Sequence, residues 1–188
     1  MKKKNKKDGY TIIETMIAVS LFLVIIITGM GTFLNANLLH QKSQDMRSIM
    51  DSLNFIMNDM SRSLRTGYGY RCQNAASITL GSPMSCAFNS AIVFKPEDYV
   101  NNPNLWAYSI SGGKISKSTD NATSFVQLTP DEVIIEQADG FSILGAESIA
   151  TDSQQPFVII RLVGRIILKN TSTPFSLQTS ISQRLIDV

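Results

Sequence analysis

The sequence predicts an α+β fold in which one long N-terminal helix packs on an antiparallel β-sheet head. Residues 10–66 contain no proline, and the second half of this range repeats apolar residues at helical spacing. Beyond Tyr70 the chain breaks into short β-prone runs separated by Gly, Pro and Asn. The last two runs alternate apolar and polar residues, which is typical of an antiparallel sheet with one packed face and one wet face.

The N-terminus has the charge pattern of a membrane anchor. Lysines dominate residues 2–7, whereas Thr15–Gln41 contains no residue with a fixed charge. About 20 apolar residues at ~1.5 Å each span a bilayer core of roughly 30 Å, and the stretch Met16–Leu34 has that length. Flanking lysines favour the cytoplasmic side. We therefore expect a single-pass helix with its N-terminus in the cytoplasm and the rest of the chain outside.

Glu14 stands out because it lies at the start of this apolar helix. An unpaired carboxylate near the bilayer centre costs on the order of 3 kcal/mol, and it costs less near the interface. Cleavage between Gly9 and Tyr10 would create a new α-amino group four residues before Glu14. In two copies offset along their axes, this amine and the Glu14 carboxylate could neutralise each other. The sequence thus indicates a helix that packs against copies of itself.

The lysine-rich leader, Gly9, Tyr10 and Thr11-Ile12-Ile13-Glu14 before a long apolar helix resemble the class III signal of type IV prepilins and pseudopilins. The resemblance implies a pilin fold, cleavage after Gly9 and N-methylation of Tyr10 by a prepilin peptidase, with Glu14 setting register in a filament. The implied partners are other pilin or pseudopilin subunits, the lipid bilayer before assembly, and an inner-membrane assembly platform with its ATPase. It also implies a periplasmic or extracellular head and a cell-surface filament after assembly.

Two other interpretations of the N-terminus remain open. A plain membrane anchor for a non-polymerising extracellular binding domain explains the lysines and the helix length, but neither Gly9 nor Glu14. An ordinary secretory signal would have a shorter apolar segment, and Asn35-Ala36-Asn37 is a poor version of its cleavage site.

A weaker resemblance extends into the rest of the chain. The segments 53–65, 112–115 and 177–184 resemble pseudopilin J and PilW-like minor pilins, which favours a minor over a major subunit. The sequence does not specify whether the filament serves protein secretion, motility, adhesion or DNA uptake.

These patterns divide the chain into a leader at 1–9, a transmembrane or filament-core helix at 10–34, an amphipathic half of the same helix at 35–66 and a β head at 67–188. The amphipathic half is predicted to bury one stripe in the core. We expect the helix to stop at Thr66-Gly67-Tyr68-Gly69, where glycine supplies the left-handed cap. The apolar stripe consists of Leu39, Met46, Ile49, Met50, Leu53, Ile56, Met57, Met60 and Leu64.

Strands are predicted in two groups. The clearest are 157–168 and 175–185, with a turn at 170–174, and a hairpin at 105–116 turning at Gly112-Gly113. Shorter candidates lie at 77–80, 91–94, 125–128, 133–136 and 141–144.

The chain contains two cysteines, Cys72 and Cys86. An exported chain meets an oxidising compartment, where such a pair commonly forms a disulfide, and a loop of this size contributes roughly 3 kcal/mol in the chain-entropy model. Zinc is disfavoured because the only histidine is His40, and free buried thiols remain an alternative.

The charge of the chain does not favour nucleic-acid binding. The leader holds five lysines and one aspartate, so its removal changes the formal net charge from +2 to −2. A basic strip on the head could contact DNA, but a solvated face paired with acids is the simpler expectation. The strip consists of Arg161, Arg165, Lys169 and Arg184.

No phosphate loop, His-Glu-x-x-His motif or Ser/His/Asp set is visible, so we expect no enzyme and no cofactor. A calcium site is the one metal hypothesis, but its spacing matches no known loop pattern, and solvated turns are the simpler reading. The residues concerned are Asp120, Asn121, Asp131 and Glu132.

Overall fold

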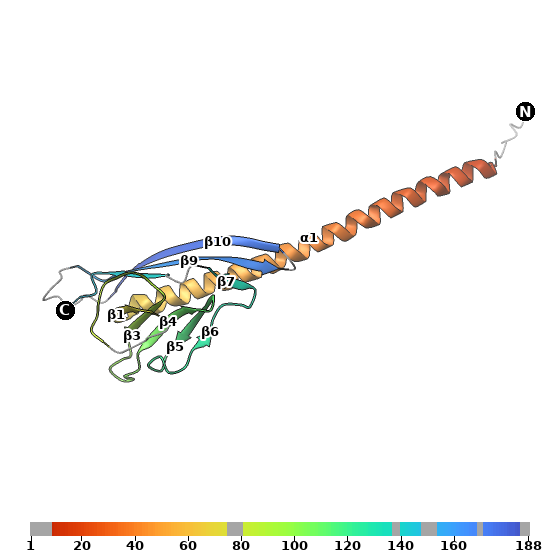
Figure 1. The fold of residues 1–188 in the computed structure, drawn as a ribbon. Coiled ribbons are helices and arrows are strands. Elements are labelled where there is room, and N and C mark those ends of the chain that lie inside the picture. Colours follow the sequence, from red (N-terminus) through yellow and green to blue (C-terminus); the bar gives the residue numbers. More distant parts are fainter. Residues whose placement is uncertain (1–8, 75–80, 137–139, 148–153, 169–170, 185–188) are drawn as a thin grey trace, which may run out of the picture. The chain divides into compact units, whose positions relative to one another are not determined.

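The computed structural model describes residues 9–74, 81–136, 140–147, 154–168 and 171–184. Within these described residues one helix, α1 (Ile12–Thr66), is followed by ten strands, which confirms the predicted α+β class (Figure 1). The strands are β1 (Tyr68–Gln73), β2 (Cys86–Asn89), β3 (Ala91–Lys95), β4 (Trp106–Ser111), β5 (Lys114–Ser118), β6 (Val126–Gln127), β7 (Val133–Ile135), β8 (Phe141–Leu144), β9 (Phe157–Leu168) and β10 (Thr171–Ser182).

The chain divides into two compact units, residues 1–45 and residues 46–188. In the first unit the described structure is helical from Ile12 onward. The second unit, called the head below, contains the last part of α1 and all ten strands.

The strands of the head form two sheets. The first has the order β1-β3-β4-β5-β6, and the second has the order β10-β9-β8-β2, with β7 also paired to β9. All strand pairs are antiparallel, and the only parallel pairing in the described part of the head is an isolated bridge between Arg71 and Met84. The sequence predicted the strands as one sheet and did not give their order.

The predicted helical stripe becomes the centre of the core. In Figure 1 the yellow end of α1 runs between β9 and β10 on one side and the green strands on the other. One cluster joins the helix to both sheets, because the apolar faces of both sheets meet the same stripe. Leu39 was predicted to join the stripe, but it is 69% exposed and belongs to the first unit. The buried helix residues are Ile49, Leu53, Ile56, Met57, Met60 and Leu64.

The helix ends at Thr66 as expected, and of the two glycines in the predicted cap Gly69 has a positive φ of 64°. Gly67 does not have a positive φ, and its N–H still donates to Ser63 O at 3.1 Å. Glycine is needed there because a Cβ atom would overlap the ring of Phe94. The buried Tyr70 hydroxyl lies 2.5 Å from Leu64 O and 2.6 Å from Gly67 O, so a phenol from β1 caps the carbonyl end of the helix.

The hairpin at Gly112-Gly113 is confirmed. Both glycines have positive φ, 58° and 76°, as a type I′ turn requires. This turn also joins the two sheets, because Ile135 N donates to Gly113 O at 2.8 Å. Next to it, Lys114 Nζ reaches the carbonyls of Pro130, Asp131 and Val133 at 3.1, 2.9 and 2.7 Å.

The final hairpin is longer than predicted. The segment 170–174 was predicted as a turn, but β10 already begins at Thr171, and Pro174 pairs with Arg165 inside the strand. Proline is tolerated because β10 lies at the edge of its sheet, where a missing N–H need not break a ladder. The predicted alternation holds, since odd-numbered residues of β10 are half-buried or buried and even-numbered residues are exposed.

The remaining strand predictions have mixed outcomes. Strands occur at the segments predicted around 91–94, 125–128, 133–136 and 141–144. The candidate at 77–80 lies outside the described residues, as does Leu185. The short strand β2 was not predicted; it contains a bulge at which Phe88 has a φ of 47°.

Candidate functional site

The segment predicted to be processed and assembled forms a capped helix start. Thr11 precedes the first helical residue, and its Oγ1 accepts a hydrogen bond from Glu14 N at 3.3 Å, while Thr15 N donates to Thr11 O at 3.2 Å. The spacing Thr11-x-x-Glu14 is that of a capping box, and it can be recognised in the sequence alone. A carboxylate in the first turn is also favoured by the helix dipole.

Gly9, Tyr10 and Glu14 are all open to solvent. Tyr10 is 84% exposed, and a Cβ atom built on Gly9 meets no atom within 4 Å. Gly9 therefore lies in a solvent-accessible segment just before the helix. The Glu14 side chain is also exposed. Nothing in the packing of the chain explains a glycine at position 9.

The apolar part of α1 is long and hydrophobic enough to span a membrane, and none of the most apolar window is buried inside the protein. Apolar side chains such as Phe22, Ile27 and Phe33 are 60–71% exposed. A helix that is hydrophobic and unburied in its own chain requires an apolar environment supplied by lipid or by other helices.

The hydroxyl groups of this apolar stretch are satisfied within the helix. Each donates to a backbone carbonyl three or four residues earlier, at 2.8–3.0 Å, so none demands water. This arrangement suits an apolar environment, in which every polar group must find an internal partner. The donors are Thr15, Ser20, Thr28 and Thr32.

Cys72 and Cys86 form a disulfide, with their Cα atoms 6.0 Å apart. Cys72 lies on β1 of the first sheet and Cys86 on β2 of the second, so the bond joins the two sheets. Within the second sheet, Ser142 Oγ on β8 donates a hydrogen bond to Cys86 O on β2 at 3.1 Å.

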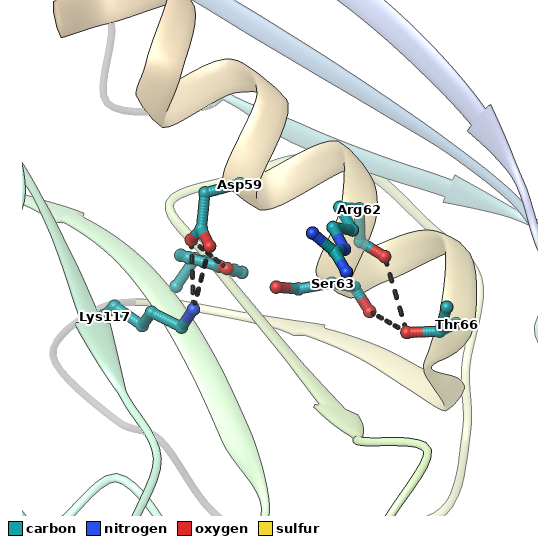
Figure 2. Close-up of polar contacts among 6 residues, drawn as sticks. Asp59, Arg62, Ser63, Thr66 and Lys117 are labelled. Carbon is teal, nitrogen blue, oxygen red and sulfur yellow. Dashed lines mark hydrogen bonds and ion pairs between the residues drawn. The ribbon is translucent and has the colours of Figure 1, made fainter.

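A polar cluster joins α1 to the first sheet (Figure 2). Lys117 Nζ lies 3.0 Å from Asp59 Oδ2, and the Tyr108 hydroxyl donates to the same oxygen at 2.9 Å. Lys117 Nζ also lies 4.7 Å from the centre of the Trp106 ring. Nearby, the Thr66 hydroxyl points back to helix carbonyls, as Figure 2 shows. Through these contacts the Asp59 carboxylate ties the helix to β4 and β5.

The pKa values in this cluster follow from burial. Desolvation raises the pKa of the fully buried Tyr108 phenol well above its usual 10.0, and the neighbouring Asp59 charge acts in the same direction, while Ser63 opposes it. The phenol is therefore a permanent hydrogen-bond donor at ordinary pH.

The residues considered for calcium are engaged in turn structure. The Asp120 carboxylate accepts hydrogen bonds from Ser118 Oγ at 2.6 Å and from Ser124 N at 3.0 Å, which lowers its pKa. Asp131 Oδ1 instead accepts from Gln127 Nε2 at 3.1 Å. In the part of the chain that the structure describes, no three His, Cys, Asp or Glu side chains are grouped to hold a metal ion.

The basic strip on the outer face of the second sheet is partly paired. Arg165 Nη1 lies 3.1 Å from Glu136 Oε1, with both side chains about half exposed. Arg161 and Arg184 are exposed, and Lys169 lies outside the described residues.

The chain shows no significant match to any known protein-family profile, to any curated protein or to any solved structure.

Proposed function

We propose that this protein is a structural subunit of a type IV pilus-like or type II secretion-like filament, and that it resembles a minor pilin or pseudopilin. In this proposal the precursor is cleaved after Gly9 by a prepilin peptidase and Tyr10 becomes a methylated N-terminus. The apolar helix first holds the subunit in the cytoplasmic membrane, with the head on the other side.

One observation carries the proposal: a helix capped by Thr11 begins at Ile12, shortly after Gly9, and its long apolar surface is not buried by its own chain. Lipid can cover this surface before assembly and neighbouring helices can cover it afterwards. The exchange is nearly neutral because lipid tails are as apolar as side chains. An assembly platform and its ATPase would then supply the work of extraction.

Glu14 has a specific role in the proposal. After cleavage, the amino group of Tyr10 on one copy would meet the Glu14 carboxylate of a neighbour, and each would neutralise the other among apolar helices. This pairing sets the axial offset between subunits.

The same helix also supports a second candidate, a single-pass anchor for an extracellular binding domain that never polymerises. The two candidates differ in processing. Intact-mass analysis of the protein from membranes should give a chain that begins at Tyr10 and carries one methyl group if it is a filament subunit. A chain that retains Met1 would support the anchor.

Two variants test the filament proposal in its native host. Gly9→Ala should block cleavage, whereas Glu14→Ala should be cleaved normally and fail to enter filaments. Asp51→Ala, an exposed acidic position further along α1, serves as the control and should be cleaved and assembled. Normal filaments from both test variants would refute the proposal.

A further inference from the structure

A cavity of about 380 Å³ lies on the outer face of the first sheet, away from the core. Its floor is made by β1 and β3 at Gly69, Arg71, Val93 and Lys95. Its walls are Pro83 on one side and Tyr99, Pro103 and Leu105 of the loop after β3 on the other. The volume is in the lower range of small-molecule sites, enough for a ligand of about one ring.

Two cations line this cavity, and neither has an acidic partner. Among the described residues no carboxylate forms an ion pair with Arg71 or Lys95. The neighbouring acids, Glu97 and Asp98, line a different hollow together with Asp59. Two positive charges in one cavity repel each other when no counterion is present. A bound anion would therefore be favoured at this site.

The Arg71 guanidinium is also short of hydrogen-bond acceptors. Its Nε is buried without a partner in the described structure, and Nη1 makes only a long bond of 3.4 Å to Ser82 O. A buried donor without a partner is unfavourable and calls for a specific explanation. The guanidinium packs directly against Gly81, where any side chain would overlap it.

Lys95 is held by aromatic rings rather than by acids. Its Nζ lies 5.1 Å from the centre of the Tyr99 ring and 5.8 Å from that of Tyr68, and the two rings meet edge to face. The lysine stem packs over Gly69, where the absence of a side chain leaves room between the two cations. The cavity thus has a cationic floor and mainly apolar walls.

From this geometry we propose that the cavity binds a small carboxylate whose body is an apolar ring. The carboxylate would accept hydrogen bonds from Arg71 and Lys95, and the ring would pack between Tyr99, Pro103 and Leu105. Besides the Tyr99 hydroxyl, the lining has one further polar side chain, Asn121, whose amide is already bonded to Leu105 N and Asn104. A ligand rich in hydroxyl groups would therefore find few hydrogen-bond partners in the cavity. The lining favours a ligand whose body is an apolar ring. This site is independent of processing and assembly.

The test is calorimetric titration of the full-length protein in detergent micelles with phenylacetate, using empty micelles as the blank. Phenylacetamide has the same shape without the charge, acetate has the charge without the ring, and inorganic phosphate is a ringless dianion. We expect phenylacetate to bind at least about tenfold more tightly than phenylacetamide, because a hydrogen bond to a charged group contributes about one order of magnitude or more. It should also bind at least about tenfold more tightly than acetate and phosphate, because these anions have no ring to bury against the apolar walls.

Two variants locate the binding. Lys95→Met keeps the apolar stem and Arg71→Met removes the guanidinium, and each should weaken phenylacetate binding about tenfold or more. Arg161→Met, an exposed arginine on β9, is the matched control and should bind like the wild type. If Arg71→Met does not fold, Lys95→Met alone decides the question. Absence of binding, equal binding of acid and amide, phosphate binding as tight as phenylacetate, or wild-type affinity in Lys95→Met would each overturn the proposal.

Discussion

Asp59 on α1 holds two groups of the first sheet with one carboxylate: Lys117 Nζ lies 3.0 Å from its Oδ2, and the Tyr108 hydroxyl donates to that oxygen at 2.9 Å. The Lys117 side chain is only 18% exposed and that of Asp59 is 35% exposed, so water competes weakly with the pair. The three residues lie on α1, β4 and β5, which makes the contact a tie between helix and sheet.

Replacing Asp59 by alanine should therefore destabilise the head. Lys117 would lose its counterion and the buried Tyr108 hydroxyl would lose its acceptor, at a cost of about 1–3 kcal/mol. Urea denaturation followed by circular dichroism measures this cost. Asp51→Ala, an exposed position on the same helix, should change the stability by less than about 0.5 kcal/mol. Equal effects of the two substitutions would show that the tie contributes nothing.

Tyr108 predicts a specific dependence on alkaline pH. Burial raises its pKa above the usual 10.0 in the folded protein, so the unfolded chain loses the proton first. The stabilising contribution is therefore complete below about pH 10 and declines as the pH rises through that value. Tyr108→Phe should flatten the decline in unfolding free energy above pH 10, whereas the exposed Tyr10→Phe should leave it unchanged.

Local periodicity predicted much of this fold because the signals lie within single segments. In β9 the apolar residues of one face recur at every second position or nearly so, at Val158, Ile160, Leu162, Ile166 and Leu168, and all five are buried. The helix stripe from Ile49 to Leu64 and the Gly112-Gly113 turn were read in the same way. In each case the residues that decide the structure are near neighbours in the sequence.

Features that depend on distant residues were not predictable in this way. Asp59 and Lys117 are 58 residues apart, and neither has an unusual local context. The role of Gly67 depends on Phe94, which approaches it only in the folded protein. The cavity of Arg71 and Lys95 likewise forms only when β1 pairs with β3. By contrast, the Thr11-x-x-Glu14 cap was visible in the sequence and was overlooked because Glu14 had been considered only as a charge.

The disulfide should stabilise the head mainly by restricting the unfolded chain, in which it closes the loop between Cys72 and Cys86. The cysteines are 14 residues apart, and a loop of this size corresponds to about 3 kcal/mol in the chain-entropy model. The double variant Cys72→Ala/Cys86→Ala should lose about that amount in urea denaturation. Adding a reducing agent should destabilise the wild type to a similar level and leave the double variant unaffected, so a further loss in the variant would contradict the assignment.

Gly67→Ala should destabilise the head although alanine is the better helix former. The added methyl group would overlap the Phe94 ring, and overpacking of this kind costs about 1–3 kcal/mol. Phe94→Leu opens space at the same place, so the glycine substitution should cost less in that background. A double-mutant cycle in urea measures the coupling, and additive effects would show that the contact with Phe94 is not the cause.

Thr11 and Glu14 allow the capping role of this helix start to be separated from the charge role proposed for assembly. Thr11→Ala removes the acceptor of the Glu14 N–H and should cost about 1 kcal/mol of helix stability at its first turn. Glu14→Gln keeps the side-chain length and the local cap but removes the carboxylate that would pair with a neighbour's amino group. If the charge sets the register, Glu14→Gln should abolish incorporation into filaments while Thr11→Ala remains incorporated at a reduced level. Quantifying each variant in sheared filament fractions against its membrane pool tests this. Loss of assembly in Thr11→Ala with normal assembly of Glu14→Gln would mean that the cap, and not the ion pair, is what the filament requires.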